Sequence, residues 1–271
     1  METQLGRFAA LHERAEPLKF AYPIILLPDL FCRSRQLATM LGYLASIGWE
    51  GFAPELSSPD DGATGLIGGC DDFIGRVSEV IAAVAKDAIL IGHGIGGTIS
   101  LRMAGFPGVK AAVAIAPMLP GFRSRALSRA GCAFAQWTGR NLKPPRGKLL
   151  FEMIADVEPF QREQIIKGLQ SERPSLPLQV MESTADFVST KSSAPRLIVC
   201  GDSDRFAPID QVGEFATSIG AEFKAIAGRG HWLIGGRALE RIVYETQRFL
   251  VRSLGQDLLL LLTEEWKTAT D

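Results

Sequence analysis

The sequence predicts an α/β fold with a mostly parallel central sheet, helices on both faces and an inserted helical lid. Short apolar runs alternate with helix-like stretches up to residue 117 and again from residue 195. Most of the strand candidates are continuous apolar runs, which is typical of parallel strands covered on both faces. We therefore expect a core of residues 1–117 and 195–271, interrupted by a lid over residues 118–194.

The elements before the lid follow from local patterns. Each strand candidate is a short, mainly apolar run, and each helix candidate repeats apolar residues at helical spacing. The strand candidates are residues 23–27, 51–54, 88–91 and 111–115. The helix candidates are residues 35–47, 72–86 and 95–104.

The alternation stops between residues 117 and 195, where helical segments are separated by breakers such as residues 143–147. It resumes with two strands and two helices: residues 196–200 (strand), 209–219 (helix), 222–226 (strand) and 236–254 (helix). Residues 258–262 are interpreted as a C-terminal helix that covers the core or forms a homodimer contact.

Composition excludes several classes of protein. The chain has 271 residues, 46% of them hydrophobic, so it is neither disordered nor collagen-like and can bury a full core. No apolar run, residues 258–262 included, approaches the ~18 residues of a membrane span, and no signal peptide is expected. The four cysteines show no metal or disulfide spacing, and no nucleic-acid-binding module is present. We expect a cytoplasmic protein with no cofactor and no metal.

The net charge of −1 hides a regional split. Residues 88–151 contain nine Lys and Arg and no Asp or Glu, so all 30 acidic residues lie elsewhere. The basic residues are predicted to surround the entrance of a site, which would suit an apolar substrate with an anionic group or a carrier-protein tether. A solvated lid face is the simpler alternative, and attraction to a membrane surface is another.

The glycine-rich turn at residues 92–97 has two interpretations. As G-x-G-x-x-G it would bind a dinucleotide, but that requires an acidic residue about 20 positions later, and none occurs before Glu152. As G-x-S-x-G it would be a nucleophile elbow, with Gly92 and Gly96 as the flanking glycines and Gly94 at the serine position. The second interpretation is favoured.

Four further segments carry a family resemblance. Residues 26–34 look like an oxyanion loop after an early strand, and residues 51–56 (G-F-A-P-E-L) resemble a strand end that closes in P-D-L. Residues 201–208 match a G-x-x-D-x-x-x-P acid loop, and residues 228–232 match a catalytic-histidine loop. With these motifs the sequence resembles the α/β-hydrolase family over nearly the whole chain.

The resemblance implies a role for specific residues. Asp204 takes the position of the triad acid and His231 that of the triad histidine, in the family's chain order. The backbone N–H groups of Leu30 and Ile95 take the positions of the oxyanion hole. For Asp204 the alternative is a helix N-cap, and for His231 a structural histidine.

The sequence departs from the family pattern in three places, of which Glu55, where Asp is usual, is expected to have little consequence. Gly94 has no side chain, so no acyl-enzyme can form at that position. Asp29, which follows Pro28 where the family has His-Gly, would oppose a developing negative charge. Asp29 is either a loop residue or a second acid/base group facing His231. In the second case burial would raise the pKa of the Asp29 carboxyl, so that it could donate a proton.

The remaining candidates line a predicted apolar pocket beneath the lid. Cys32 is either a replacement nucleophile or an inert packing residue, and His93 is expected to lie beneath the elbow as a structural residue. The residues predicted to bind substrate are Phe31, Cys32, His93, Phe122, Trp137 and Trp232.

Three functions are consistent with these residues. The first is an enzyme that uses a His231–Asp204 dyad and a backbone oxyanion hole for non-covalent hydrolysis, C–C cleavage, elimination or cyclisation of a small apolar carbonyl, ester or thioester. The second is a catalytically silent binding protein. The third is a serine hydrolase of esters or thioesters in which residue 94 has been changed from Ser to Gly by engineering.

Overall fold

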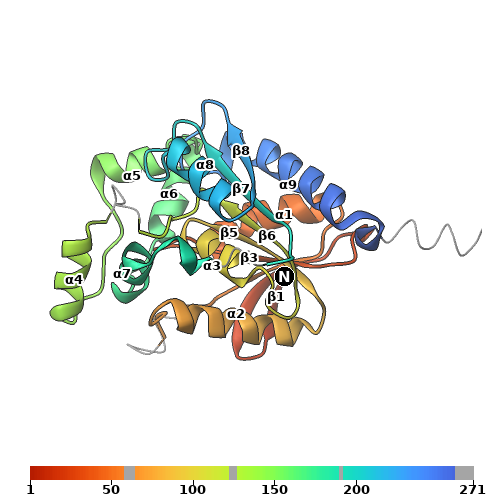
Figure 1. Cartoon of the computed structure of the whole chain (residues 1–271), viewed down its shortest axis with the longest axis horizontal. Helices are drawn as coiled ribbons and strands as arrows, with labels where there is room; N and C mark the ends of the chain where they lie inside the picture. Colours follow the sequence, from red (N-terminus) through yellow and green to blue (C-terminus); the bar gives the residue numbers. More distant parts are fainter. Residues whose placement is uncertain (58–64, 122–126, 189–191, 260–271) are drawn as a thin grey trace, which may run out of the picture.

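The computed structural model describes residues 1–57, 65–121, 127–188 and 192–259. Its centre is an eight-stranded sheet in the order β1-β2-β4-β3-β5-β6-β7-β8 (Figure 1). All neighbouring pairs from β4 to β8 are parallel, and β1 and β2 add an antiparallel edge. The strands are β1 (Glu2–Leu5), β2 (Phe8–Glu13), β3 (Ile24–Leu27), β4 (Gly51–Pro54), β5 (Ala88–His93), β6 (Val109–Ile115), β7 (Arg196–Gly201) and β8 (Glu222–Ile226).

Helices cover both faces of this sheet because its strands are apolar on both faces. In β3, Ile24 and Leu26 join one core cluster, and Ile25 and Leu27 join another, as the two-residue period of a strand requires. The first cluster is closed by α1 (Ala38–Ser46) and α9 (Leu239–Leu254), and the second by α2 (Cys70–Val84) and α3 (Ile95–Met103); α8 (Ile209–Ser218) packs beside β7 and β8. The predicted fold class is therefore confirmed.

The described residues between β6 and β7 include the α-helices α4 to α7, which lie together on the left of Figure 1. They are α4 (Arg129–Trp137), α5 (Gly147–Met153), α6 (Pro159–Gly168) and α7 (Ser175–Glu182). The backbone N–H of Gln170 donates to the carbonyl of Phe31 over 2.8 Å, so the insertion is joined to the loop after β3. This arrangement is consistent with the predicted lid.

The antiparallel edge was not predicted from the sequence. β1 and β2 mix polar and apolar residues, and Glu13 pairs with Gly51 of β4 although a charged residue is a weak strand signal. The C-terminal segment also differs from the expectation. Leu258 ends a short 3-10 helix, η5 (Gly255–Leu258), and Leu259 forms a bridge with Phe20; residues 260–262 lie outside the described part.

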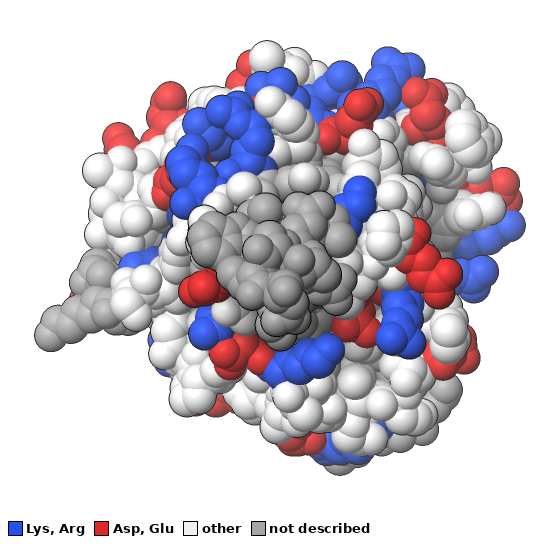
Figure 2. Space-filling view, turned by 90° about the vertical axis from the view of Figure 1, so that its right-hand side faces the viewer, with Lys and Arg blue, Asp and Glu red and all other residues white. Residues whose placement is uncertain are grey.

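The predicted ring of basic residues around the site is wrong for Lys110. This residue lies near the amino end of β6 and its Nζ is 2.9 Å from Asp87, whereas the glycine turn follows the carboxyl end of β5. Figure 2 shows the face at the right of Figure 1, away from the helices α4 to α7, and on that face basic and acidic side chains are interspersed. Arg123 and Arg125 lie outside the described residues.

Among the described helices, none has the length and apolar character that crossing a bilayer requires.

Candidate active site at the carboxyl ends of the strands

Gly94 forms a sharp turn between β5 and α3. Its φ of 52° and ψ of −120° are costly for any residue with a side chain. A Cβ on Gly92 would lie 2.1 Å from the backbone carbonyl carbon of Gly96, and a Cβ on Gly96 would lie 2.5 Å from the carbonyl oxygen of Pro28. The glycines of the motif are thus required by close backbone approach, as in a nucleophile elbow.

Two loops on the other side of the turn hold His231 and Asp204. Asp204 follows β7, and its Oδ1 accepts hydrogen bonds from the backbone N–H groups of Phe206 (2.7 Å) and Ala207 (3.1 Å). Its Oδ2 lies 2.9 Å from Nδ1 of His231, which follows β8. Both side chains are buried, so the carboxylate fixes the orientation and the protonated nitrogen of the ring.

Asp29 reaches the same histidine from the opposite side. It follows β3, and its Oδ2 lies 3.2 Å from Nε2 of His231, while its Oδ1 accepts a hydrogen bond from the backbone N–H of Ile95 over 2.9 Å. A Cβ on Gly94 would lie 1.8 Å from Asp29 Oδ1. The Asp29 carboxylate therefore occupies the space that a side chain at position 94 would take.

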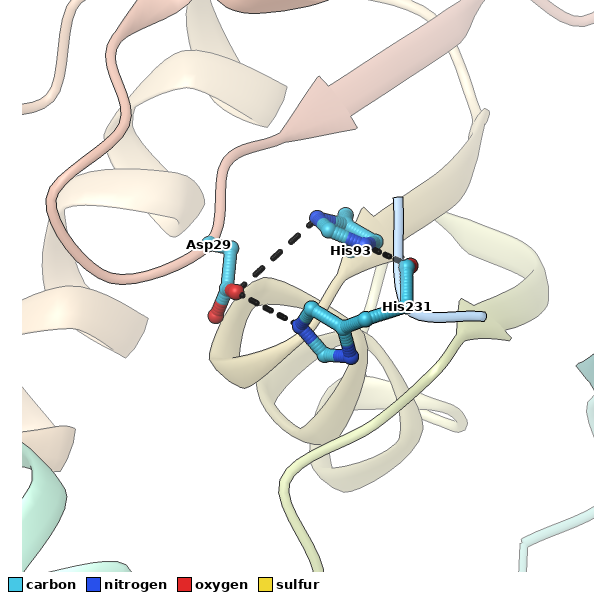
Figure 3. Close-up of side chains that lie close together, drawn as sticks. All are labelled: Asp29, His93 and His231. Atoms are coloured by element: carbon cyan, nitrogen blue, oxygen red, sulfur yellow. Dashed lines mark hydrogen bonds and ion pairs between the residues drawn. The ribbon is translucent and has the colours of Figure 1, made fainter. Parts of the chain in front are cut away.

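His93, the last residue of β5, completes a compact group of side chains (Figure 3). Its Nε2 lies 3.0 Å from the carbonyl oxygen of His231, and its Nδ1 lies 3.9 Å from Asp29 Oδ2. Because a carbonyl oxygen only accepts, Nε2 carries the hydrogen and Nδ1 of the neutral ring is a free acceptor. Burial lowers the pKa of His93 and so favours the neutral ring.

The charges on Asp29 and His231 stabilise each other. Burial alone would lower the pKa of His231, but the charges and hydrogen bonds of Asp204 and Asp29 raise it to about 10. Burial alone would raise the pKa of Asp29, but its hydrogen bond with His231 and the Ile95 N–H bring it down to about 2. The expectation of a proton-donating Asp29 with a raised pKa is therefore wrong, since an imidazolium and a backbone N–H face it.

An apolar cavity of about 500 Å³, including its open mouth, adjoins this group. Asp29, Gly94 and His231 form its polar end. Core and lid supply its apolar walls, which include Leu30, Phe31, Met118, Leu127, Pro145, Met153 and Phe206. The cavity has few polar groups at one end of an apolar space, as small-molecule sites commonly do, and its use as the substrate pocket stays a prediction.

The other predicted site residues lie in different places. Cys32 is buried behind the loop, and burial, followed by the Asp29 charge, raises the pKa of its thiol well above the ordinary value. Trp232 is buried with its ring 5.7 Å from that of His93. Trp137 is 82% exposed on α4 and is not among the residues that line the cavity. Phe122 lies outside the described residues.

An ion-pair network that sequence reasoning missed supports the Asp29 loop. Arg33 is buried and pairs with Glu172 of the lid in a close hydrogen bond, and its Nε lies 3.6 Å from Glu55 of the β4 loop. Arg33 Nη1 also donates to the carbonyl of Cys32 over 2.8 Å. No sequence signal marks these partners, because they are distant in the chain and each is an ordinary charged residue.

A sequence model described as the Alpha/beta hydrolase family matches residues 12–243 of the chain. That range contains the turn at Gly94, Asp204 and His231, and it spans most of the chain. None of the curated proteins matches the sequence.

Solved structures support the same fold. A monoacylglycerol lipase of Paleococcus ferrophilus is 17% identical, with a TM-score of 0.73 over 91% of this chain and 99% of that one. A thermophilic esterase of Thermogutta terrifontis is 14% identical, with a TM-score of 0.67 over 93% and 98%. The thioesterase domain from the curacin biosynthetic pathway is 14% identical, with a TM-score of 0.66 over 91% and 98%. At these identities the likeness concerns the fold.

Proposed function

Because the chain belongs to the alpha/beta hydrolase family, we propose that it hydrolyses an ester or thioester with an apolar acyl group by direct attack of water, without a serine nucleophile. One observation carries this proposal: the Asp29 carboxylate fills the space of a residue-94 side chain and contacts both His231 Nε2 and the Ile95 N–H. The apolar cavity beside it supports the acyl group, as do the esterase and thioesterase neighbours.

The proposed mechanism uses the Asp29 carboxylate as a general base and the His231 imidazolium as a general acid. The Asp29 carboxylate takes a proton from the attacking water, whose oxygen bonds to the carbonyl carbon. The His231 imidazolium gives its Nε2 proton to the leaving oxygen or sulfur as the bond to the acyl carbon breaks. The proton on Asp29 then passes to His231 Nε2 across their 3.2 Å contact, which restores the starting charges and releases an acid and an alcohol or thiol.

The predicted oxyanion hole requires a small movement in this mechanism. The Ile95 N–H donates to Asp29 Oδ1, so a substrate oxyanion must take the place of that oxygen. Protonation of Asp29 by the attacking water weakens its hold on the N–H at the step where negative charge develops on the substrate. The Leu30 and Ile95 N–H groups are still the proposed oxyanion hole. Asp29 Oδ1 moves away from the Ile95 N–H when the substrate oxyanion binds there.

The fit between Gly94 and Asp29 favours natural divergence over an engineered serine replacement. A Ser restored at position 94 would place its Cβ 1.8 Å from Asp29 Oδ1 and 2.0 Å from Asp29 Cγ. These two departures from the family pattern are therefore mutually dependent, whereas a single engineered change would leave the rest of the site suited to serine.

The test is turnover of p-nitrophenyl esters of increasing acyl length, followed with intact-protein mass spectrometry. We expect steady hydrolysis without an initial burst and without a mass gain on the protein. His231→Ala is expected to abolish turnover, and Cys32→Ala, which removes the alternative nucleophile, is expected to keep it. Normal turnover in His231→Ala, or an acyl adduct on any residue, would exclude the proposed mechanism.

A silent binding protein is the alternative outcome. It would bind a fatty acid or acyl amide in the cavity, and neither the unaltered chain nor His231→Ala would hydrolyse an ester.

A further inference from the structure

We infer that Asp29, His93 and His231 form a binding site for one divalent transition-metal ion of the zinc type. The site deepens the proposed function, on which its catalytic consequence rests, whereas metal binding itself rests on the arrangement of the three side chains. Asp29 Oδ2 lies 3.2 Å from His231 Nε2 and 3.9 Å from His93 Nδ1, and the three donor atoms lie within 4.8 Å of one another. Figure 3 shows the three side chains pointing toward one another.

The first argument is the unused nitrogen of His93. The ring is 1% exposed, and Nδ1 has no hydrogen-bond partner within the described residues. Since Nε2–H donates to the His231 carbonyl, Nδ1 presents a lone pair toward the Asp29 carboxylate. Two electron-rich atoms that face each other in a buried place repel each other, and a cation bound between them would remove this repulsion.

The second argument is that both histidines are held as metal ligands usually are. A ligating histidine donates its other ring N–H to a carboxylate or a backbone carbonyl, which fixes the lone pair toward the metal. His231 Nδ1 has the Asp204 carboxylate at 2.9 Å, and His93 Nε2 has a backbone carbonyl at 3.0 Å. Both outer contacts are already formed, so the two lone pairs are oriented in advance.

The third argument is charge. Asp29 and Asp204 place two carboxylates on either side of the His231 ring, in a largely buried group. A divalent ion bound at His231 Nε2 would balance both of these charges. Two imidazoles and one carboxylate are also the donor set of catalytic zinc sites that keep a position open for water.

The geometry needs only side-chain adjustment. Tetrahedral zinc with bonds near 2.1 Å separates its donors by about 3.4 Å, so the His93–Asp29 separation of 3.9 Å would shorten by about 0.5 Å. All three donor atoms lie within 4.8 Å of one another, so no two of them have to approach by more than about 1.4 Å to reach that separation. Gly94 permits this arrangement, since a Cβ there would displace Asp29.

The open position of the ion would face the apolar cavity, because Asp29, Gly94 and His231 all line it. A water bound there loses a proton near neutral pH. The resulting hydroxide would add to the ester carbonyl carbon, and the bond to the leaving oxygen would break with a proton taken from solvent. The same products form as in the metal-free mechanism, with water activated by the ion.

The experiment is calorimetric titration of chelator-treated full-length protein with Zn²⁺, together with Co²⁺ binding followed by its visible absorption. We expect one ion per chain.

His93→Gln is the decisive variant, because the metal-free mechanism gives His93 no chemical role. An amide N–H can still donate toward the His231 carbonyl, but the amide is a poor zinc ligand. We expect Zn²⁺ affinity to fall more than 100-fold, beyond the ~10–100-fold cost of losing an outer contact. His12→Gln is the matched control, since His12 contacts Glu50 on a different part of the sheet, and Cys32→Ser tests for thiolate binding.

Absence of stoichiometric binding, or binding that His12→Gln or Cys32→Ser weakens as much as His93→Gln, would overturn the site. Ester hydrolysis that persists unchanged after chelation, with a requirement for His231, would overturn the metal's catalytic role and leave the proposed function standing. Stoichiometric binding without any hydrolysis would support the site and contradict the proposed function.

Discussion

The two carboxylates on either side of His231 are held in different ways. Asp204 has a side chain with no exposed surface and accepts two backbone N–H groups on one oxygen. Asp29 is 13% exposed, accepts one backbone N–H, and lines the cavity. Its separation from the histidine is also longer, at 3.2 Å against 2.9 Å.

This difference assigns the two groups separate tasks. A carboxylate fixed by several donors away from the cavity orients the ring and supports its charge. A carboxylate with fewer donors and a cavity face can exchange partners during a reaction. Under the proposed function, Asp204 therefore positions the His231 ring and Asp29 takes part in the chemistry, and the predictions below test that division.

The largest expected effect is the loss of activity in Asp29→Asn. The amide cannot take a proton from water, so kcat should fall by roughly 10²–10⁴-fold, the usual contribution of a general base. Asp204→Asn should also lose activity and should in addition lose about 1.5–3 kcal/mol of stability, because it gives up a buried hydrogen bond between charged groups.

The measurement is kcat on a p-nitrophenyl ester together with urea unfolding of each variant. Glu214→Gln, which changes an exposed carboxylate in the middle of α8, serves as the control and should alter neither quantity. Full activity in Asp29→Asn would remove Asp29 from the chemistry.

The next effect is on stability. Gly94→Ser should destabilise the protein by about 2–5 kcal/mol, from the strained φ of 52° and the collision with Asp29. Asp29→Gly in the same chain should recover part of this loss, since it removes the atoms that a Cβ would meet. Denaturant unfolding of the two single variants and the double variant measures the coupling, and purely additive effects would contradict the claimed mutual dependence.

A smaller effect is expected in the pH dependence of stability. The pKa of His231 is raised from 6.5 to about 10 in the folded protein, so its stabilisation is complete below pH 6.5 and is lost as pH rises toward 10. The pKa of Asp29 is lowered from 3.8 to about 2, so its share is present above pH 3.8 and lost as pH falls toward 2. Melting temperatures between pH 2 and 10 should vary less steeply in Asp29→Asn, and identical curves would contradict the ion pair.

The smallest effect concerns Trp137. Its indole is 82% exposed on α4, so Trp137→Ala should change stability by less than about 0.5 kcal/mol and KM by less than twofold. Phe31, which lines the cavity and was predicted alongside it, offers the contrast: Phe31→Ala should raise KM for long acyl chains. A large rise in KM for Trp137→Ala would show that the lid brings this ring to the substrate.

The parts of the fold that were predicted correctly are those whose sequence pattern lies within a few neighbouring residues. β3 and β5 are short apolar runs, and Gly92 and Gly96 mark a turn that allows no side chains. β1 and β2 were missed because an edge hairpin is defined by pairing with β4, which no local pattern records.

The chemistry of the site was harder to predict than its position. Asp204 and His231 lie in recognisable loops, but the charge state of Asp29 depends on a histidine 202 residues away. The absence of a metal was predicted from cysteine spacing, whereas the donors proposed here come from three loops or strand ends that only the sheet brings together. His93 likewise looked structural because nothing in its own segment shows where Nδ1 points.

The most direct test of the division between the two carboxylates is ¹⁵N NMR of the His231 ring in chelator-treated protein. An imidazolium held by Asp204 and Asp29 predicts two protonated ring nitrogens from pH 5 upward, with the Nε2 proton lost only as pH approaches about 10. In Asp29→Asn the same transition should occur at a lower pH. A wild-type ring that loses its proton near the ordinary value of 6.5 would contradict the account.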